Sequence, residues 1–117
     1  MLAWLIAGHL IGDFLLQNKW MSENKEKKLP PLLIHSAVYT AAVFSLSLAE
    51  GGISVLSALL IFIAHIILDK RRFVRWWCKN ITKSYPQATL AVMTDQAWHI
   101  AALVLACILD SFLKGVL

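Results

Sequence analysis

The sequence has few charged residues for its length. Of its 117 residues, 15 % are charged and 59 % are hydrophobic, whereas soluble domains have about 25 % charged and about 45–50 % apolar residues. So apolar a composition excludes a disordered chain. It also excludes a soluble nucleic-acid-binding module, although the net charge is +4. We therefore expect an integral membrane protein with no nucleic-acid partner.

Cysteine is scarce as well. Cys78 lies in a basic segment and Cys107 in an apolar run, and no C-x-x-C pair is present. This excludes a small disulfide-stapled domain, and we expect neither thiol to be a metal ligand. The first residues lack the basic stretch of a signal peptide, so we expect them to be retained as a membrane helix.

Four apolar segments are long enough to form or approach membrane spans. A span takes about 20 residues, with a range of about 17–25, and its backbone must be hydrogen-bonded internally, which favours helices. The prediction is an all-α, four-helix transmembrane bundle in a single domain over residues 1–117. Its helices are expected at about 2–17, 31–49, 53–69 and 90–113.

Basic residues are concentrated in two of the three connections. Ten of the eleven lie in the first and third: Lys19, Lys25, Lys27, Lys28, Lys70, Arg71, Arg72, Arg75, Lys79 and Lys83. Two such loops share one side of a four-helix chain, and the positive-inside rule makes that side cytoplasmic. Both termini are then expected outside.

The third connection, about residues 70–86, has its own helical pattern. Apolar and aromatic residues recur at helical spacing opposite the basic ones: Phe73, Val74, Trp77, Ile81 and Tyr85. This predicts a basic amphipathic helix in the membrane interface, between helices 3 and 4. It either only anchors the chain or binds anionic lipid head groups, with Arg71, Arg72 and Arg75 as the phosphate-binding candidates.

Histidine and aspartate form a pattern inside the predicted helices. Three pairs are spaced by four residues, His9–Asp13, His65–Asp69 and Asp95–His99, and the second helix adds His35. A spacing of four places both side chains on one helical face. Counting along each helix from its cytoplasmic end puts all seven residues in one layer. Buried polar residues in membranes are costly and usually functional, although each alone could also be a polar contact between helices.

Seven candidate ligands are too many for one tetrahedral ion. They favour two divalent ions bridged by carboxylates, and nitrogen with oxygen donors suits zinc first, then iron or manganese. Gln17, Tyr39, Lys70 and Gln96 lie beside the ligands, and we expect Gln17 and Gln96 to orient them. Asp110, with Lys114 four residues on, is expected to be a solvated pair.

The motifs resemble those of a known family. The segments His9-Leu-Ile-Gly-Asp13-Phe-Leu-Leu-Gln17, His35-Ser-Ala-Val-Tyr39, His65-Ile-Ile-Leu-Asp69-Lys and Asp95-Gln-Ala-Trp-His99 are similar to those of small bacterial and phage membrane proteins catalogued as domain of unknown function 3307. That resemblance implies the bacterial inner membrane and no stated activity. A looser similarity to membrane-bound metal-dependent hydrolases is an analogy of motif type.

Several functions remain open from the sequence. The first is a metal-dependent hydrolase that acts on a phospholipid or lipid-linked phosphate at the cytoplasmic interface, with its catalytic residues unassigned. The alternatives are a metal-ion or proton transport protein, a bis-histidine haem protein, and an accessory membrane protein without chemistry. Four short helices also leave lateral surface for self-association into a homo-oligomer.

Overall fold

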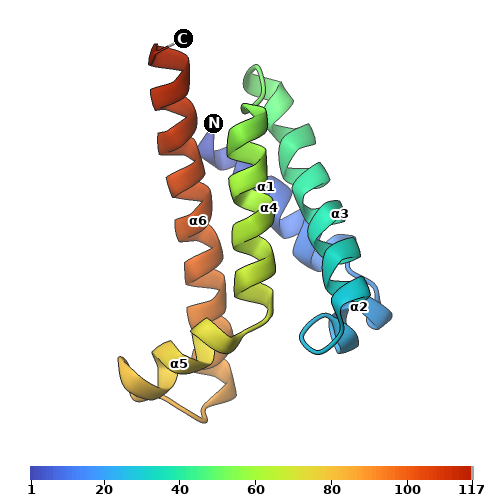
Figure 1. Ribbon diagram of the computed structural model, residues 1–117, viewed down its shortest axis with the longest axis vertical. Coiled ribbons are helices and arrows are strands. Elements are labelled where there is room, and N and C mark those ends of the chain that lie inside the picture. Colours follow the sequence, from blue (N-terminus) through green and yellow to red (C-terminus); the bar gives the residue numbers. More distant parts are fainter. Residues whose placement is uncertain (117) are drawn as a thin grey trace.

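A computed structural model describes residues 1–116, and every regular element among them is helical (Figure 1). Six α-helices are joined by one π-helical and one 3-10 segment. In chain order the elements are α1 (Leu2–Leu10), a π-helical turn (Ile11–Leu15), α2 (Lys19–Asn24), α3 (Leu29–Ser47), a 3-10 turn (Leu48–Glu50), α4 (Val55–Asp69), α5 (Arg72–Asn80) and α6 (Ala88–Val116). The all-α prediction is therefore confirmed.

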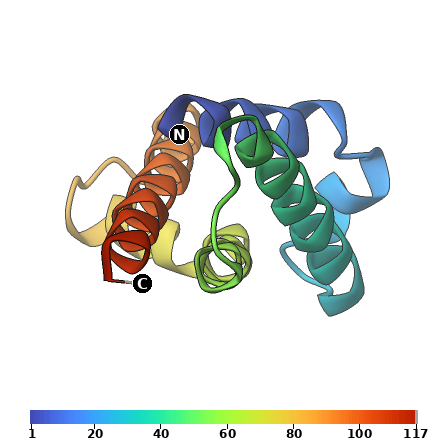
Figure 2. The same cartoon turned by 90° about the horizontal axis from the view of Figure 1, so that it is seen from above.

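Four helices surround a common interior. Figure 2, viewed from above, shows α1 on one side of α3 and α6, with α4 on the opposite side. Each of α1 and α4 packs against both α3 and α6. The short helices α2 and α5 lie at the same end of this arrangement, below α3 and α6 in Figure 1. That end receives the first and third connections, and with them the basic residues.

Two glycines allow α1 and α3 to pack closely. A Cβ atom built at Gly8 would lie 2.6 Å from Val43 Cα, and one at Gly12 would lie 3.0 Å from Tyr39 Cα. Any larger side chain at either position would therefore push the two backbones apart. The contact brings the polar residues of α1 and of the π-helical turn next to α3.

Several element boundaries differ from those expected. The first connection contains the extra helix α2, whose N-terminus is capped by the Asn18 side chain, which accepts a hydrogen bond from Met21 N at 2.8 Å. Helix α5 ends at Asn80, so Ile81 and Tyr85 lie beyond it. The backbone of Lys83 is left-handed, with φ 52°, a conformation that does not continue a right-handed helix.

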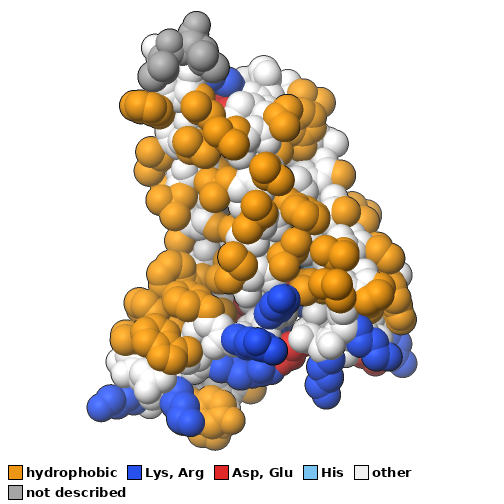
Figure 3. Space-filling model, viewed as in Figure 1, with side chains coloured by type: hydrophobic (Ala, Val, Ile, Leu, Met, Phe, Trp, Pro, Cys, Tyr) orange, Lys and Arg blue, Asp and Glu red, His pale blue; other side chains and the backbone are white. Residues whose placement is uncertain are grey.

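The length criterion for a membrane span is met by two segments of the structure. Leu29–Glu50 and Ala88–Gly115 are long and apolar enough to cross a bilayer, whereas the apolar helices Leu2–Leu15 and Val55–Asp69 are shorter. Apolar side chains cover the flanks of the molecule and Lys and Arg side chains gather at the end that carries α5 (Figure 3). Two of the four expected spans therefore have the required length.

The expected solvated pair at the opposite end is instead half-buried. Asp110 is only 3 % exposed; its Oδ1 accepts a hydrogen bond from Ser54 N at 2.7 Å, and its Oδ2 lies 3.0 Å from Lys114 Nζ. Lys114 also donates to Gly52 O. The pair thus joins the start of α4 to the end of α6, and the prediction of a solvent-exposed pair is wrong for Asp110.

Candidate metal centre

The structure brings all seven predicted ligands into one buried cluster. They come from α1, the π-helical turn, α3, α4 and α6, and none is more than 6 % exposed. They are His9, Asp13, His35, His65, Asp69, Asp95 and His99. One donor atom from each of Asp13, His35, His65 and Asp69 lies within 4.8 Å of the other three, and a second group is Asp69, Asp95 and His99.

The four-residue group has the dimensions of a tetrahedral site. His35 Nε2 lies 3.0 Å from Asp13 Oδ1 and 3.1 Å from Asp69 Oδ2, and His65 Nε2 lies 3.2 and 3.5 Å from the same two oxygens. A zinc-like ion with bonds of about 2.0–2.2 Å separates tetrahedral donors by about 3.3–3.6 Å. One of the four distances lies in this range and the other three are slightly shorter, so the atoms are close to the spacing that surrounds one ion.

Hydrogen bonds alone do not satisfy these four atoms. Each imidazole Nε2 carries at most one proton, yet each faces two carboxylate oxygens. Asp69 Oδ2 is buried and accepts no hydrogen bond from the described residues; its charged neighbour is the Lys25 ammonium, whose Nζ lies 3.0 Å away. A divalent cation between the four donors would satisfy all of them at once.

The π-helical turn sets the position of Asp13. It spans Ile11–Leu15 and interrupts the regular spacing of the first helix, with Leu16 N donating to Ile11 O. Single π turns within α-helices occur often at functional sites. Because Gly12 lies against Tyr39 on α3, the turn holds Asp13 beside His35.

Asp69 joins the two groups. Its Oδ2 belongs to the four-residue group, whereas its Oδ1 lies 3.1 Å from His99 Nε2. Asp95 completes the second group, and its buried Oδ1 also accepts no hydrogen bond from the described residues. This group has three protein donors, the number that catalytic zinc sites have when water fills the fourth position.

Two of the histidines are held by hydrogen bonds to their Nδ1 atoms. His99 Nδ1 lies 2.7 Å from Asp95 O, and His65 Nδ1 lies 3.0 Å from Ser36 Oγ. Such partners fix the ring and leave Nε2 free for an ion, as is usual around metal-binding histidines. Ser36 was not singled out from the sequence, because nothing in its spacing distinguishes it from other small residues of the helix.

His9 is in the cluster but outside both donor groups. Its Nδ1 lies 2.8 Å from Tyr39 Oη and its Nε2 lies 2.8 Å from Gln96 Oε1, so both ring nitrogens are occupied. Asp13 Oδ2 is 3.6 Å from Nδ1. The structure therefore places His9 as a partner of Tyr39 and Gln96, next to the six residues of the two groups.

The four residues expected to orient ligands have different positions. Gln96 contacts both His9 and Asp95, with its Nε2 3.3 Å from Asp95 Oδ2, and Tyr39 contacts His9. Gln17 donates to the backbone oxygen of Asp13 at 3.2 Å. Lys70 is exposed at the end of α4 and lines a surface hollow together with Arg72, so it contacts none of the donor groups.

A buried lysine contacts the cluster, and the sequence did not identify it as part of the site. Lys25, just after α2, is 8 % exposed, and its Nζ lies 3.0 Å from Asp69 Oδ2. It is one of four lysines in the first connection, and no sequence pattern marks it as the one that turns inward. Among residues 1–116, its ammonium is the only lysine or arginine group within 4 Å of a carboxylate oxygen of the two donor groups.

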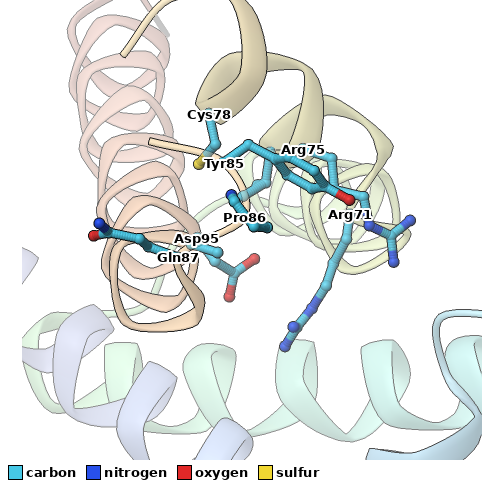
Figure 4. A pocket seen from close by; sticks show the side chains of 9 residues that line it. Arg71, Arg75, Cys78, Tyr85, Pro86, Gln87 and Asp95 are labelled. Atoms are coloured by element: carbon cyan, nitrogen blue, oxygen red, sulfur yellow. The ribbon is translucent and has the colours of Figure 1, made fainter. Parts of the chain in front are cut away.

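The three arginines expected to bind lipid phosphate separate in the structure. Arg75 forms an ion pair with Glu26, and Arg72 lines the hollow beside Lys25 and Lys70. Arg71 and Arg75 both line a cavity of about 120 Å³ between α5 and α6, and Asp95 lines the same cavity. Figure 4 shows the Arg71 and Asp95 side chains pointing into this shared space, whereas Gln87 points away from it.

The sequence as a whole matches one protein family. The profile of the family described as "Protein of unknown function (DUF3307)" matches residues 1–114. The chain belongs to this family. The resemblance drawn from the histidine and aspartate motifs is thereby confirmed, while comparison with curated proteins and with solved structures gives no match.

The chemistry of this DUF3307 protein is therefore indicated by its own side chains. The two donor groups offer imidazole nitrogens and carboxylate oxygens without thiolate, a set that suits zinc, iron or manganese. Both cysteines are free thiols, and Cys78 lies in the wall of the cavity. The buried groups can hold a metal ion, and the group that includes Asp95 borders an open space.

Proposed function

We propose that this protein is a four-helix integral membrane protein that binds two divalent metal ions. Two helices have the length of a span; the two shorter ones cross with local thinning of the bilayer. Exposed apolar side chains on α4 and α6 support this assignment, among them Val55, Leu59, Leu105, Ile108 and Phe112. The basic end lies in the cytoplasm, which places the metal centre at the inner face of the bacterial inner membrane.

One observation carries the metal proposal. Asp69 is shared between a closed group of four donors and an open group of three. Each group contains a buried carboxylate oxygen that accepts no hydrogen bond from the described residues, and the one in Asp69 lies 3.0 Å from Lys25 Nζ. Carboxylates that bridge two ions about 3.5–4 Å apart are typical of hydrolytic metal sites. We assign zinc as the first candidate, with iron and manganese as the alternatives.

The reaction that this arrangement supports best is hydrolysis of a phosphate ester. An ion at the three-donor group would keep a position for water and lower the pKa of that water. The neighbouring cavity carries Arg71, whose guanidinium suits a phosphate group. Because the cavity opens at the basic end, the substrate class is a phospholipid or another lipid-linked phosphate.

The structure gives less support to a haem centre. The imidazole rings are packed with centroids 4.8 Å apart for His35 and His65, 5.1 Å for His65 and His99, and 5.6 Å for His9 and His99. A porphyrin between two axial histidines would need the rings further apart. No feature of the described residues specifically favours transport over hydrolysis.

The test is hydrolysis by the purified full-length chain. The protein would be incubated, with and without zinc, with mixed vesicles of phosphatidic acid and phosphatidylglycerol, and released phosphate and head groups measured. We expect metal-dependent release that His99→Ala abolishes and Lys79→Ala, an exposed change on α5, leaves intact. Stoichiometric metal without turnover, together with zinc flux into sealed vesicles, would replace hydrolysis by transport.

A further inference from the structure

Residues of opposite charge line the cavity between α5 and α6. Asp95, a member of the three-donor group, lies at its α6 side, and Arg71 projects into it from the start of α5 (Figure 4). The remaining lining is mostly apolar, with Val74, Cys78, Tyr85 and Pro86, and it also includes Arg75, which is paired with Glu26. At about 120 Å³ the space suits a phosphate-sized group, since whole drug-sized ligands need about 300 Å³ or more.

Arg71 has an unusual backbone for its residue type. Its φ of 62° and ψ of 3° are left-handed, a region that is strained for a residue with a Cβ and favours glycine. Strained residues of this kind cluster at ligand-binding sites, where the surrounding structure holds them. Glycine would be the easier residue here, so the arginine side chain is present despite the strain.

The guanidinium of Arg71 is also without an anionic partner. Among residues 1–116 no carboxylate oxygen lies within ion-pair distance of it, whereas Arg75 is paired with Glu26 and Lys25 with Asp69. An unpaired guanidinium in a small cavity is set to bind an anion, most strongly a phosphate, which it contacts through two parallel hydrogen bonds.

Asp95 limits which anions can enter. Its carboxylate would repel a phosphate placed beside Arg71 unless a cation neutralises it. An ion held by Asp69, Asp95 and His99 would do so, next to a cavity that Asp95 itself lines. A phosphate group could then contact Arg71 through one oxygen and the ion through another.

We infer that this cavity is a phosphate-binding site in which Arg71 is the anion-binding residue. The inference rests on the proposed function, because it assigns the substrate phosphate of that centre to a place. The ligand chemistry is a dianionic phosphate group, supplied either by the head group of a lipid or by free phosphate. Arg75 also lines this cavity but is paired with Glu26, and Arg72 lines the separate hollow beside Lys25.

The experiment measures phosphate binding directly. The full-length chain is placed in phosphatidylcholine nanodiscs, with zinc or with a chelator, and inorganic phosphate is titrated while its 31P resonance is followed. Three variants are compared: Arg71→Gly, which removes the guanidinium and relieves the left-handed strain; Arg71→Lys, which keeps the charge; and Arg72→Ala as the control.

We expect Arg71→Gly to weaken phosphate binding about tenfold or more. Its melting temperature should equal or exceed that of the wild type, since glycine tolerates this backbone conformation. Arg71→Lys should lie between the two and Arg72→Ala should bind as the wild type does. Equal phosphate affinity in the wild type and Arg71→Gly, in folded protein, would overturn the inference.

A second arm identifies the source of the phosphate. Part of the phosphatidylcholine is replaced by phosphatidic acid, and the titration with inorganic phosphate is repeated. If the ligand is a lipid head group, phosphatidic acid in the disc displaces inorganic phosphate, and this competition is lost in Arg71→Gly. If the ligand is free phosphate, inorganic phosphate binds with unchanged affinity.

The two proposals fail in different ways. Phosphate that binds through Arg71 in a protein that takes up no zinc would keep the anion site and remove the metal centre. Zinc that binds in two equivalents, with no phosphate binding in any lipid mixture, would keep the metal centre and overturn the anion site.

Discussion

The two ends of the helix bundle each bury aspartate, and they satisfy it in opposite ways. At the end near Ser54, Asp110 is a hydrogen-bond acceptor for the start of α4 and an ion-pair partner of Lys114. At the other end, Asp69 Oδ2 and Asp95 Oδ1 accept no hydrogen bond from the described residues, although Lys25 Nζ lies 3.0 Å from Asp69 Oδ2. The single carboxylate of Asp110 is fully paired by protein groups, whereas at the other end three buried aspartates share one lysine ion pair among the described residues.

This difference separates a structural polar contact from a binding site. In a membrane helix either could arise from the same residue type, so the presence of aspartate does not distinguish them. What distinguishes them is whether neighbouring protein groups donate hydrogen bonds to, or form ion pairs with, the carboxylate oxygens. Substitutions at one end, followed by measurement of metal binding and stability, separate the two kinds of contact.

The largest effect is expected from Asp69→Asn. Asp69 contributes one oxygen to each donor group, so the substitution removes a carboxylate ligand from both ions. We expect zinc affinity to fall on the order of a hundredfold or more, measured by competition with a chromophoric chelator. Helical circular dichroism should be retained, and a variant that still binds two ions tightly would contradict the bridging role of Asp69.

A smaller effect, of a different kind, is expected from Asp110→Asn. The substitution removes the ion pair with Lys114 and weakens the acceptor for Ser54 N, which should lower the free energy of unfolding by about 1–3 kcal/mol. Denaturant titration of the detergent-solubilised protein measures this change. Zinc content should stay as in the wild type, so a loss of metal in this folded variant would show that the two ends are not independent.

The smallest effect is expected from Lys25→Met. The ammonium of Lys25 lies 3.0 Å from Asp69 Oδ2, where it competes with an ion for the same oxygen. A divalent ion and an ammonium about 4 Å apart repel by about 8 kcal/mol at an effective dielectric constant of 20, most of which Lys25 relieves by moving away. We expect zinc affinity to rise about tenfold, by the same competition assay; a weaker affinity would mean that Lys25 instead orients Asp69.

Much of the site followed from helical spacing and chain direction. The pairs His65–Asp69 and Asp95–His99 lie on single helical faces, and alternating helix directions bring them to one depth, so their convergence needed no tertiary information. The end of the interfacial helix was harder to predict. The left-handed backbone of Lys83, which follows the helix, cannot be recognised from the spacing of apolar residues.

The remainder depends on contacts between elements that are distant in sequence. His9 has the same spacing to Asp13 as His65 has to Asp69, yet Tyr39 and Gln96 take both of its nitrogens. Lys25 turns inward only because α2 places it over Asp69. Arg71 differs from Arg72 and Arg75 in its backbone conformation, which a run of basic residues does not reveal.

The central claim is that the cluster holds two divalent ions, and metal analysis of the purified protein tests it most directly. Element-resolved mass spectrometry gives the number of ions per chain, and X-ray absorption at the metal edge gives the donor atoms. The account predicts about two ions per chain, bound only by nitrogen and oxygen at about 2.0–2.2 Å. A folded protein that holds no stoichiometric metal after zinc loading, or whose metal has sulfur ligands, would contradict it.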